Sequence, residues 1–86
     1  MKQEAPYFEG RDPQLLYIAR RMSDATELEA LLTHENIEYG VEADTYTGGF
    51  LFRTQRVGAF FYVLPDAAPA ARELLKANGW KPASAS

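Results

Sequence analysis

Several arginines lie where a turn would present backbone amides to a ligand. Arg20 and Arg21 end one apolar run, and Arg53 and Arg56 follow the Gly48-Gly49 pair. Guanidinium groups beside accessible backbone N–H groups suit phosphate or carboxylate binding. No Walker-type or GxGxxG spacing accompanies them, so ordinary pairing with nearby acidic residues is the competing interpretation. The sequence predicts a small-anion site formed by Arg20, Arg53, Arg56, Gly48 and Gly49.

The single histidine and a row of carboxylates are the other candidates for catalysis or metal binding. His34 would need a carboxylate to orient it as a general base, and its neighbour Glu35 is expected on a different face of a helix. The competing interpretation is an exposed cation near a helix C-terminus. Glu38, Glu42 and Asp44 alternate along one expected strand, where they would either bind a hard cation or form its solvated side. We therefore assign no catalytic residue, no metal site and no cofactor.

Composition narrows the class of protein. The chain has 86 residues, a formal net charge of −3, no cysteine and 47% hydrophobic residues. A chain of this length forms one domain, and without cysteine it has neither disulfides nor a thiolate zinc site. Its acidic balance argues against nucleic-acid binding, and no apolar run approaches a membrane span or a signal peptide. We expect a cytoplasmic protein that binds neither nucleic acid nor membrane.

Hydrophobic periodicity predicts a single α+β domain over residues 14–80, between an N-terminal arm (1–13) and a flexible tail (81–86). The expected order is β-α-β-β-α, with helices over about 24–35 and from Asp66 to Asn78. Ser23 or Asp24 is expected to cap the first helix and Asp66 the second. A right-handed crossover leaves room for the antiparallel return strand. The prediction is a ferredoxin-like βαββα two-layer sandwich with sheet order 1-3-2 and both helices on one face.

The strands are expected at three places. The run 15–19 is apolar on both parities, and the run 37–46 alternates between apolar and acidic residues. Phe50 to Arg53 would return from a turn at Gly48-Gly49. We expect an interruption over 54–58, and the run 59–64 is the most strand-like part of the chain.

Large apolar residues occur at both odd and even positions of these strands. The sheet face opposite the helices is therefore expected to be apolar and to need a cover. A second subunit, the arm through Tyr7 and Phe8, or a ligand would cover it. An unpaired first strand would favour edge pairing or docking of the arm. We expect a homodimer through the sheet, with interface residues Tyr17, Phe50, Phe52, Phe60 and Tyr62.

The spacing of the apolar residues resembles a known family. An Ala-x-x-Leu-x-x-Leu-Leu helix from Ala25 precedes Asn36-Ile37, where the family has Gly-Ile, and a Phe-Tyr-Val-Leu-Pro-Asp strand and an Ala-x-x-Leu-Leu helix follow. This pattern, from Leu15 to Gly79, is similar to the small bacterial domain of unknown function described as a prokaryotic signal-transducing protein. The resemblance implies a ferredoxin-like domain, loosely similar to PII-type regulators, and supplies no catalytic residues. The long arm, Asn36 and the aromatic third strand depart from the family.

Together these observations predict a non-enzymatic regulatory, signal-transducing or protein-interaction module. It would be homodimeric through its sheet and would bind a protein partner or a small anionic ligand. The alternative is a small dimeric ferredoxin-like enzyme, with His34 or a carboxylate in a cleft lined by aromatic residues.

Overall fold

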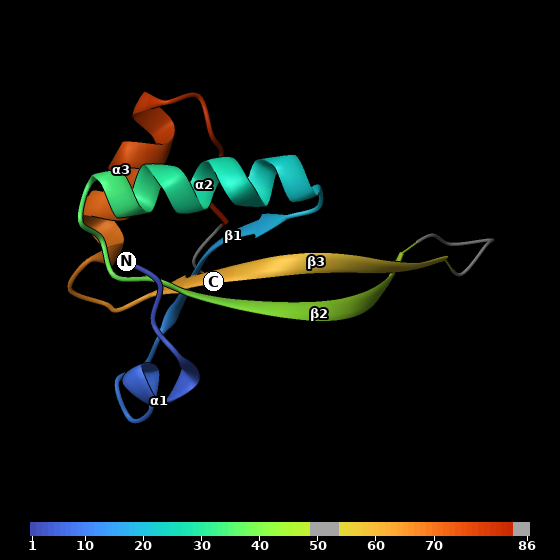
Figure 1. Cartoon of the computed structure of the whole chain (residues 1–86), viewed down its shortest axis with the longest axis horizontal. Helices are drawn as coiled ribbons and strands as arrows, with labels where there is room; N and C mark the ends of the chain where they lie inside the picture. The colour runs from blue at the N-terminus through green and yellow to red at the C-terminus, as the bar shows by residue number, and fades with distance from the viewer. Residues whose placement is uncertain (49–53, 84–86) are drawn as a thin grey trace.

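The protein folds as a three-stranded antiparallel sheet with two helices on one face and a short helix on the other (Figure 1). The computed structural model describes the backbone of residues 1–48 and 54–83, and side chains within 1–42 and 58–83. The strands, in the sheet order β1-β3-β2, are β1 (Gln14–Ala19), β2 (Gly40–Gly48) and β3 (Thr54–Val63). The helices are α1 (Ala5–Phe8), α2 (Met22–His34) and α3 (Ala68–Ala77).

The predicted fold class is confirmed. Both β1 and β2 pair with β3 in the antiparallel sense, so β1 and β2 are parallel to each other, with α2 as their crossover. This is an α+β architecture compatible with a ferredoxin-like sandwich. The interruption expected over residues 54–58 is wrong, because β3 runs unbroken from Thr54 and pairs with β2 from Thr54 to Tyr62. The irregularity lies instead in β1, as a bulge between Leu15 and Tyr17.

The helices begin differently from the prediction and end as predicted. Arg21 and Ala67 are the residues that precede α2 and α3, and neither makes a side-chain cap. The expected caps, at Ser23 or Asp24 for the first helix and at Asp66 for the second, are therefore wrong. At the end of α2, Asn36 takes a positive φ of 58°, and the Ile37 N–H donates to the Leu32 carbonyl at 2.9 Å. A left-handed residue directly after the last turn, followed by such a hydrogen bond, is a common way for a helix to end.

The core lies between the sheet and the layer formed by α2 and α3. Each helix contributes a stripe at positions i, i+3 and i+7, the spacing that one helix face requires. Phe61 and Val63 supply the facing side of β3, both with no exposed surface. The stripes are Ala25, Leu28 and Leu32 in α2 and Ala68, Ala71 and Leu75 in α3.

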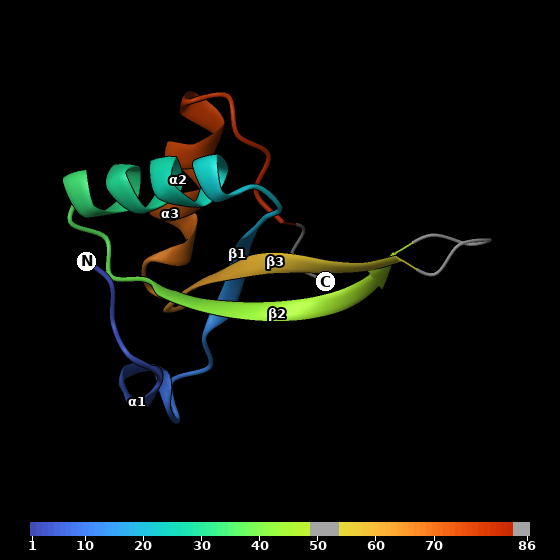
Figure 2. The same cartoon turned by 45° about the vertical axis from the view of Figure 1, so that its right-hand side comes forward.

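The arm and residues 81–83 lie along opposite edges of the sheet. The arm forms a parallel bridge between Lys2 and Tyr39, just before β2 begins. The tail reaches β1, where the Ala83 N–H donates to the Leu16 carbonyl at 2.7 Å. Of the two expectations for the edge of the first strand, edge pairing or docking of the arm, the second is wrong, because Ala83 contacts that edge and the arm contacts the opposite one. In Figure 2 the arm leads from the start of β2 to α1, below the sheet.

Candidate functional site

The sheet face opposite α2 and α3, which we call the far face, carries large apolar side chains. Because side chains alternate along a strand, Phe60 and Tyr62 point away from the core that contains Phe61 and Val63. The strand register pairs Ile18 with Phe60 and Leu15 with Tyr62. All four of these far-face side chains are half-buried. The structure thus confirms an apolar surface on this side of the sheet.

The arm covers one end of the far face. Phe8 ends α1 with 8% of its surface exposed, yet it does not belong to the main core. Its ring lies over Gly40, where a Cβ in place of the glycine hydrogen would come within 2.5 Å of Phe8 Cε2. A glycine at the start of β2 therefore allows the ring to approach the backbone. Of the three expected covers, a subunit, the arm and a ligand, the arm is the one that occupies this end.

Between the arm and the sheet runs a groove of about 610 Å³, which we call the arm groove. One wall consists of arm residues from Lys2 to Pro13, and the other of Gly40, Val41 and Glu42 of β2 with Tyr62 of β3. Three carboxylates line it, from Glu4, Glu9 and Glu42, and all three residues are exposed. The groove therefore combines an apolar floor with an acidic rim.

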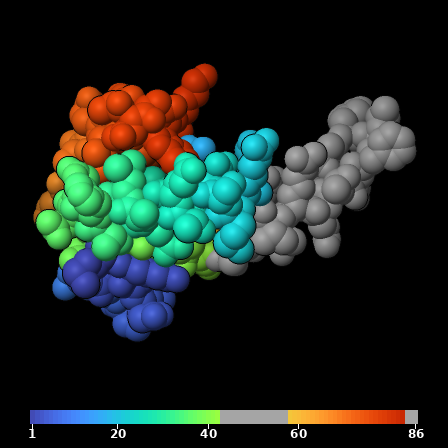
Figure 3. Space-filling view, turned by 45° about the horizontal axis from the view of Figure 1, so that its top comes forward, coloured from blue at the N-terminus to red at the C-terminus, as the bar shows by residue number. Residues whose placement is uncertain are grey.

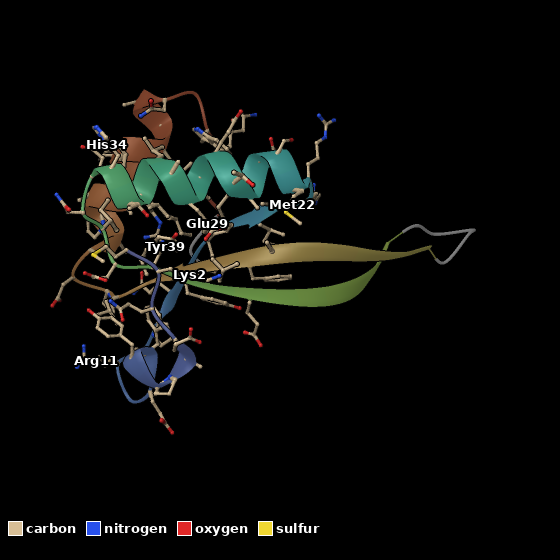
Figure 4. The ribbon with its side chains drawn as sticks, viewed as in Figure 1. Lys2, Arg11, Met22, Glu29, His34 and Tyr39 are labelled. Atoms are coloured by element: carbon tan, nitrogen blue, oxygen red, sulfur yellow. The ribbon has the colours of Figure 1, made fainter. Side chains whose placement is uncertain are left out.

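A polar network fastens the arm to the helix layer (Figure 4). The Tyr39 hydroxyl donates to Glu29 Oε1 at 3.1 Å, and Lys2 Nζ lies 4.0 Å from the same oxygen. The Tyr39 ring is 2% exposed and stacks on Phe61, with ring centroids 5.9 Å apart. The pKa of Tyr39 is raised above 10.0, mainly because the residue is buried. A hydrogen bond with Thr33 lowers this pKa in part, and the hydrogen bond and negative charge of Glu29 raise it further. The space-filling view shows the arm against α2 (Figure 3).

The residues of the predicted anion site are not brought together as far as the structure describes them. Arg20 follows Ala19, which pairs with Ala59, whereas Gly48 pairs with Thr54. These two levels are five positions apart along β3, about 17 Å at the usual rise of a strand. Gly49 and Arg53 lie outside the described residues, as does the side chain of Arg56, so the anion site remains a prediction.

His34 lies at the end of α2 with 83% of its side chain exposed. Its Nδ1 is 2.9 Å from Glu35 Oε2, so the expectation that Glu35 lies apart from the ring is wrong. Glu38 accepts a hydrogen bond from Gln3 Nε2 and thereby helps to hold the arm. Within the described residues, no group of three or more His, Cys, Asp or Glu side chains gathers as metal ligands would.

The predicted interface residues do not share one surface. Phe60 and Tyr62 lie on the far face, but Tyr17 packs on the helix side, edge to face with Trp80 at 5.2 Å between ring centroids. The β1 bulge causes this, because it shifts the alternation between Leu15 and Tyr17. Phe50 and Phe52 lie outside the described residues.

Comparison adds no relative. No family model matches the chain, and neither a curated protein nor a solved structure matches it. None of the helices in the described part of the chain is long and apolar enough to cross a membrane.

The arm groove is absent from the sequence-based expectations because it depends on where the arm lies. The apolar Tyr7-Phe8 pair does indicate a cover for the sheet, and for Phe8 this expectation is confirmed. The spacing of Glu4, Glu9 and Glu42 carries no sign that the arm returns beside β2. A glycine at the start of an alternating strand is the available clue to a close approach.

Proposed function

We propose that this protein is a non-enzymatic interaction module that forms a homodimer through the far face of its sheet. The observation that carries the proposal is the set of large apolar side chains on that face, Leu15, Ile18, Phe60 and Tyr62, outside the core and away from α2 and α3. A regulatory role of the kind that the family resemblance implies would act through this association.

A second copy of the same chain suits this surface. A two-fold interface brings the same patch of both subunits together, so each apolar residue meets a patch of equal character. Glu42, opposite Phe60 in the strand register, is the charged residue that the described part of the face carries. Interface centres are depleted of charge and enriched in aromatic residues, as the Phe60 and Tyr62 pair is.

The oligomeric state and its response to charge test the proposal. We expect sedimentation equilibrium of the unmodified chain to give a mass that rises with concentration toward twice 9.6 kDa. Phe60→Glu should weaken the dimer at least about tenfold, because it buries an unpaired charge. Met22 is 83% exposed on the helix layer, so Met22→Glu adds the same charge elsewhere and should leave the dimer intact.

Circular dichroism of both variants checks that each remains folded. A mass of one chain at every concentration would overturn the proposal. So would a folded Phe60→Glu variant that dimerises as well as Met22→Glu does.

A further inference from the structure

The arm pairs with Tyr39 and turns away where β2 begins, at Gly40. In the described part of the chain, one bridge joins Lys2 of the arm to Tyr39. Two hydrogen bonds form it: the Gln3 N–H donates to the Tyr39 carbonyl at 2.8 Å, and the Tyr39 N–H donates to the Met1 carbonyl at 3.0 Å. Glu4 then precedes α1, whose first turn contains Pro6, a residue without an N–H to continue the pairing. From Gly40 onward β2 is therefore an edge strand of the sheet.

The backbone geometry makes that edge ready for pairing. Tyr39 directs both its N–H and its carbonyl toward the arm. In an antiparallel pair the outward-directed residues recur at every second position, so Val41 turns the same two groups toward the same edge. An extended segment added here would continue the ladder where the arm ends, the arrangement known from peptides that add a strand to a sheet.

The arm groove opens beside this edge and selects the side chains of such a segment. Gly40, Val41 and Glu42 belong both to the edge and to the groove wall. Lys2 is the positively charged residue in the groove lining, and it pairs at 4.0 Å with Glu29, which lies outside the lining. Lys2 therefore does not neutralise the three carboxylates of the rim, Glu4, Glu9 and Glu42. The electrostatic complement of this rim is a cation, and the complement of the floor formed by Phe8 and Tyr62 is apolar.

We propose that the edge of β2 at Val41, together with the arm groove, binds an extended basic peptide segment by strand addition. Side chains of the segment that face the groove are Lys or Arg, whose aliphatic stems lie on the apolar floor while their charged heads reach the rim. The backbone of the segment pairs with Val41. The occupant is a segment of a partner protein that alternates basic and apolar residues. The site shares Glu42 and Tyr62 with the far face, but it does not need a second copy of the chain, so a chain that stays monomeric retains it.

An alternating Lys-Val peptide is the probe, with the alternating Glu-Val peptide as its charge control. Titration into the full chain, followed by amide chemical shifts, should move the resonances of Gly40 to Glu42 with Lys-Val and not with Glu-Val. Binding should weaken as salt rises, since the carboxylates of the rim are exposed. A Lys-Val peptide N-methylated at every second residue should lose binding, because strand addition depends on its backbone N–H groups.

Variants separate the rim from general charge. Glu42→Gln should weaken Lys-Val binding about two- to fivefold, the effect of one exposed charge pair. Glu27 is an exposed residue of α2 outside the groove, so Glu27→Gln removes the same charge and should change nothing. The proposal is overturned if the N-methylated peptide binds equally well, if Glu27→Gln weakens binding as much as Glu42→Gln, or if the shifts appear away from β2. In the Phe60→Glu variant, which is expected to be monomeric, concentration-dependent shifts at Gly40 to Glu42 without peptide would assign this edge to a second copy instead.

Discussion

At the scale of single residues, Tyr39 holds the arm, the sheet and the helix layer together. Its backbone pairs with the arm, its ring stacks on Phe61 in the core, and its hydroxyl reaches Glu29 on α2. Lys2 approaches the same Glu29 oxygen from the arm. One buried ring thus positions both walls of the arm groove.

This arrangement predicts a loss of stability at alkaline pH. The folded state holds the Tyr39 proton more tightly than the unfolded chain, because burial raises the pKa above 10.0. The resulting contribution to the free energy of unfolding is complete below pH 10.0 and disappears as the pH rises through the folded-state pKa. Urea unfolding at a series of pH values should show this decline. Tyr39→Phe should show less of it, although it loses about 1 kcal/mol at neutral pH with the hydrogen bond to Glu29. Parallel declines in the two proteins would contradict the assignment.

At the scale of elements, the close approach of α1 to β2 fixes the arm. Gly40→Ala would place a Cβ within 2.5 Å of the Phe8 ring, so the ring and the arm must move. We expect a cost of about 1–3 kcal/mol in the free energy of unfolding, as for other overpacked sites. In a Phe8→Ala background the same change should cost little, because the two sites are coupled through this contact. Denaturant unfolding of the four proteins gives the coupling, and equal costs in both backgrounds would show that Phe8 does not contact Gly40.

The helices and strands also show how much of the fold can be predicted from the sequence. Local patterns predict the strand order, the stripe of Leu28 and Leu32, and the left-handed Asn36, because periodicity and helix-closing chemistry are read within a few residues. The site depends on contacts between distant parts of the chain, such as Lys2 beside Tyr39, which no local pattern specifies. The β1 bulge is similar, because it moves Tyr17 to the opposite face from the one expected of an interface residue.

At the scale of the whole molecule, the far face and the edge of β2 are neighbouring surfaces that would bind their partners through different interactions. The domain measures 41 × 30 × 24 Å, and β2 and β3 extend beyond the end of β1 at Ala19, as Figure 1 shows. Dimerisation through Phe60 and Tyr62 buries apolar area, whereas peptide binding depends on exposed carboxylates. Raising the salt concentration should therefore weaken Lys-Val binding and leave the dimer unchanged or stronger. Sedimentation and titration at two salt concentrations check this, and a dimer that dissociates with salt would contradict an apolar interface.

The measurement that tests the central claim most directly is an isotope-filtered nuclear Overhauser experiment on a mixture of labelled and unlabelled chains. It detects only contacts between two copies. A dimer through the far face predicts contacts that connect Phe60 or Tyr62 of one copy with Leu15, Ile18 or Phe60 of the other. Intermolecular contacts confined to α2 and α3, or none at concentrations well above those of the sedimentation experiment, would contradict that dimer.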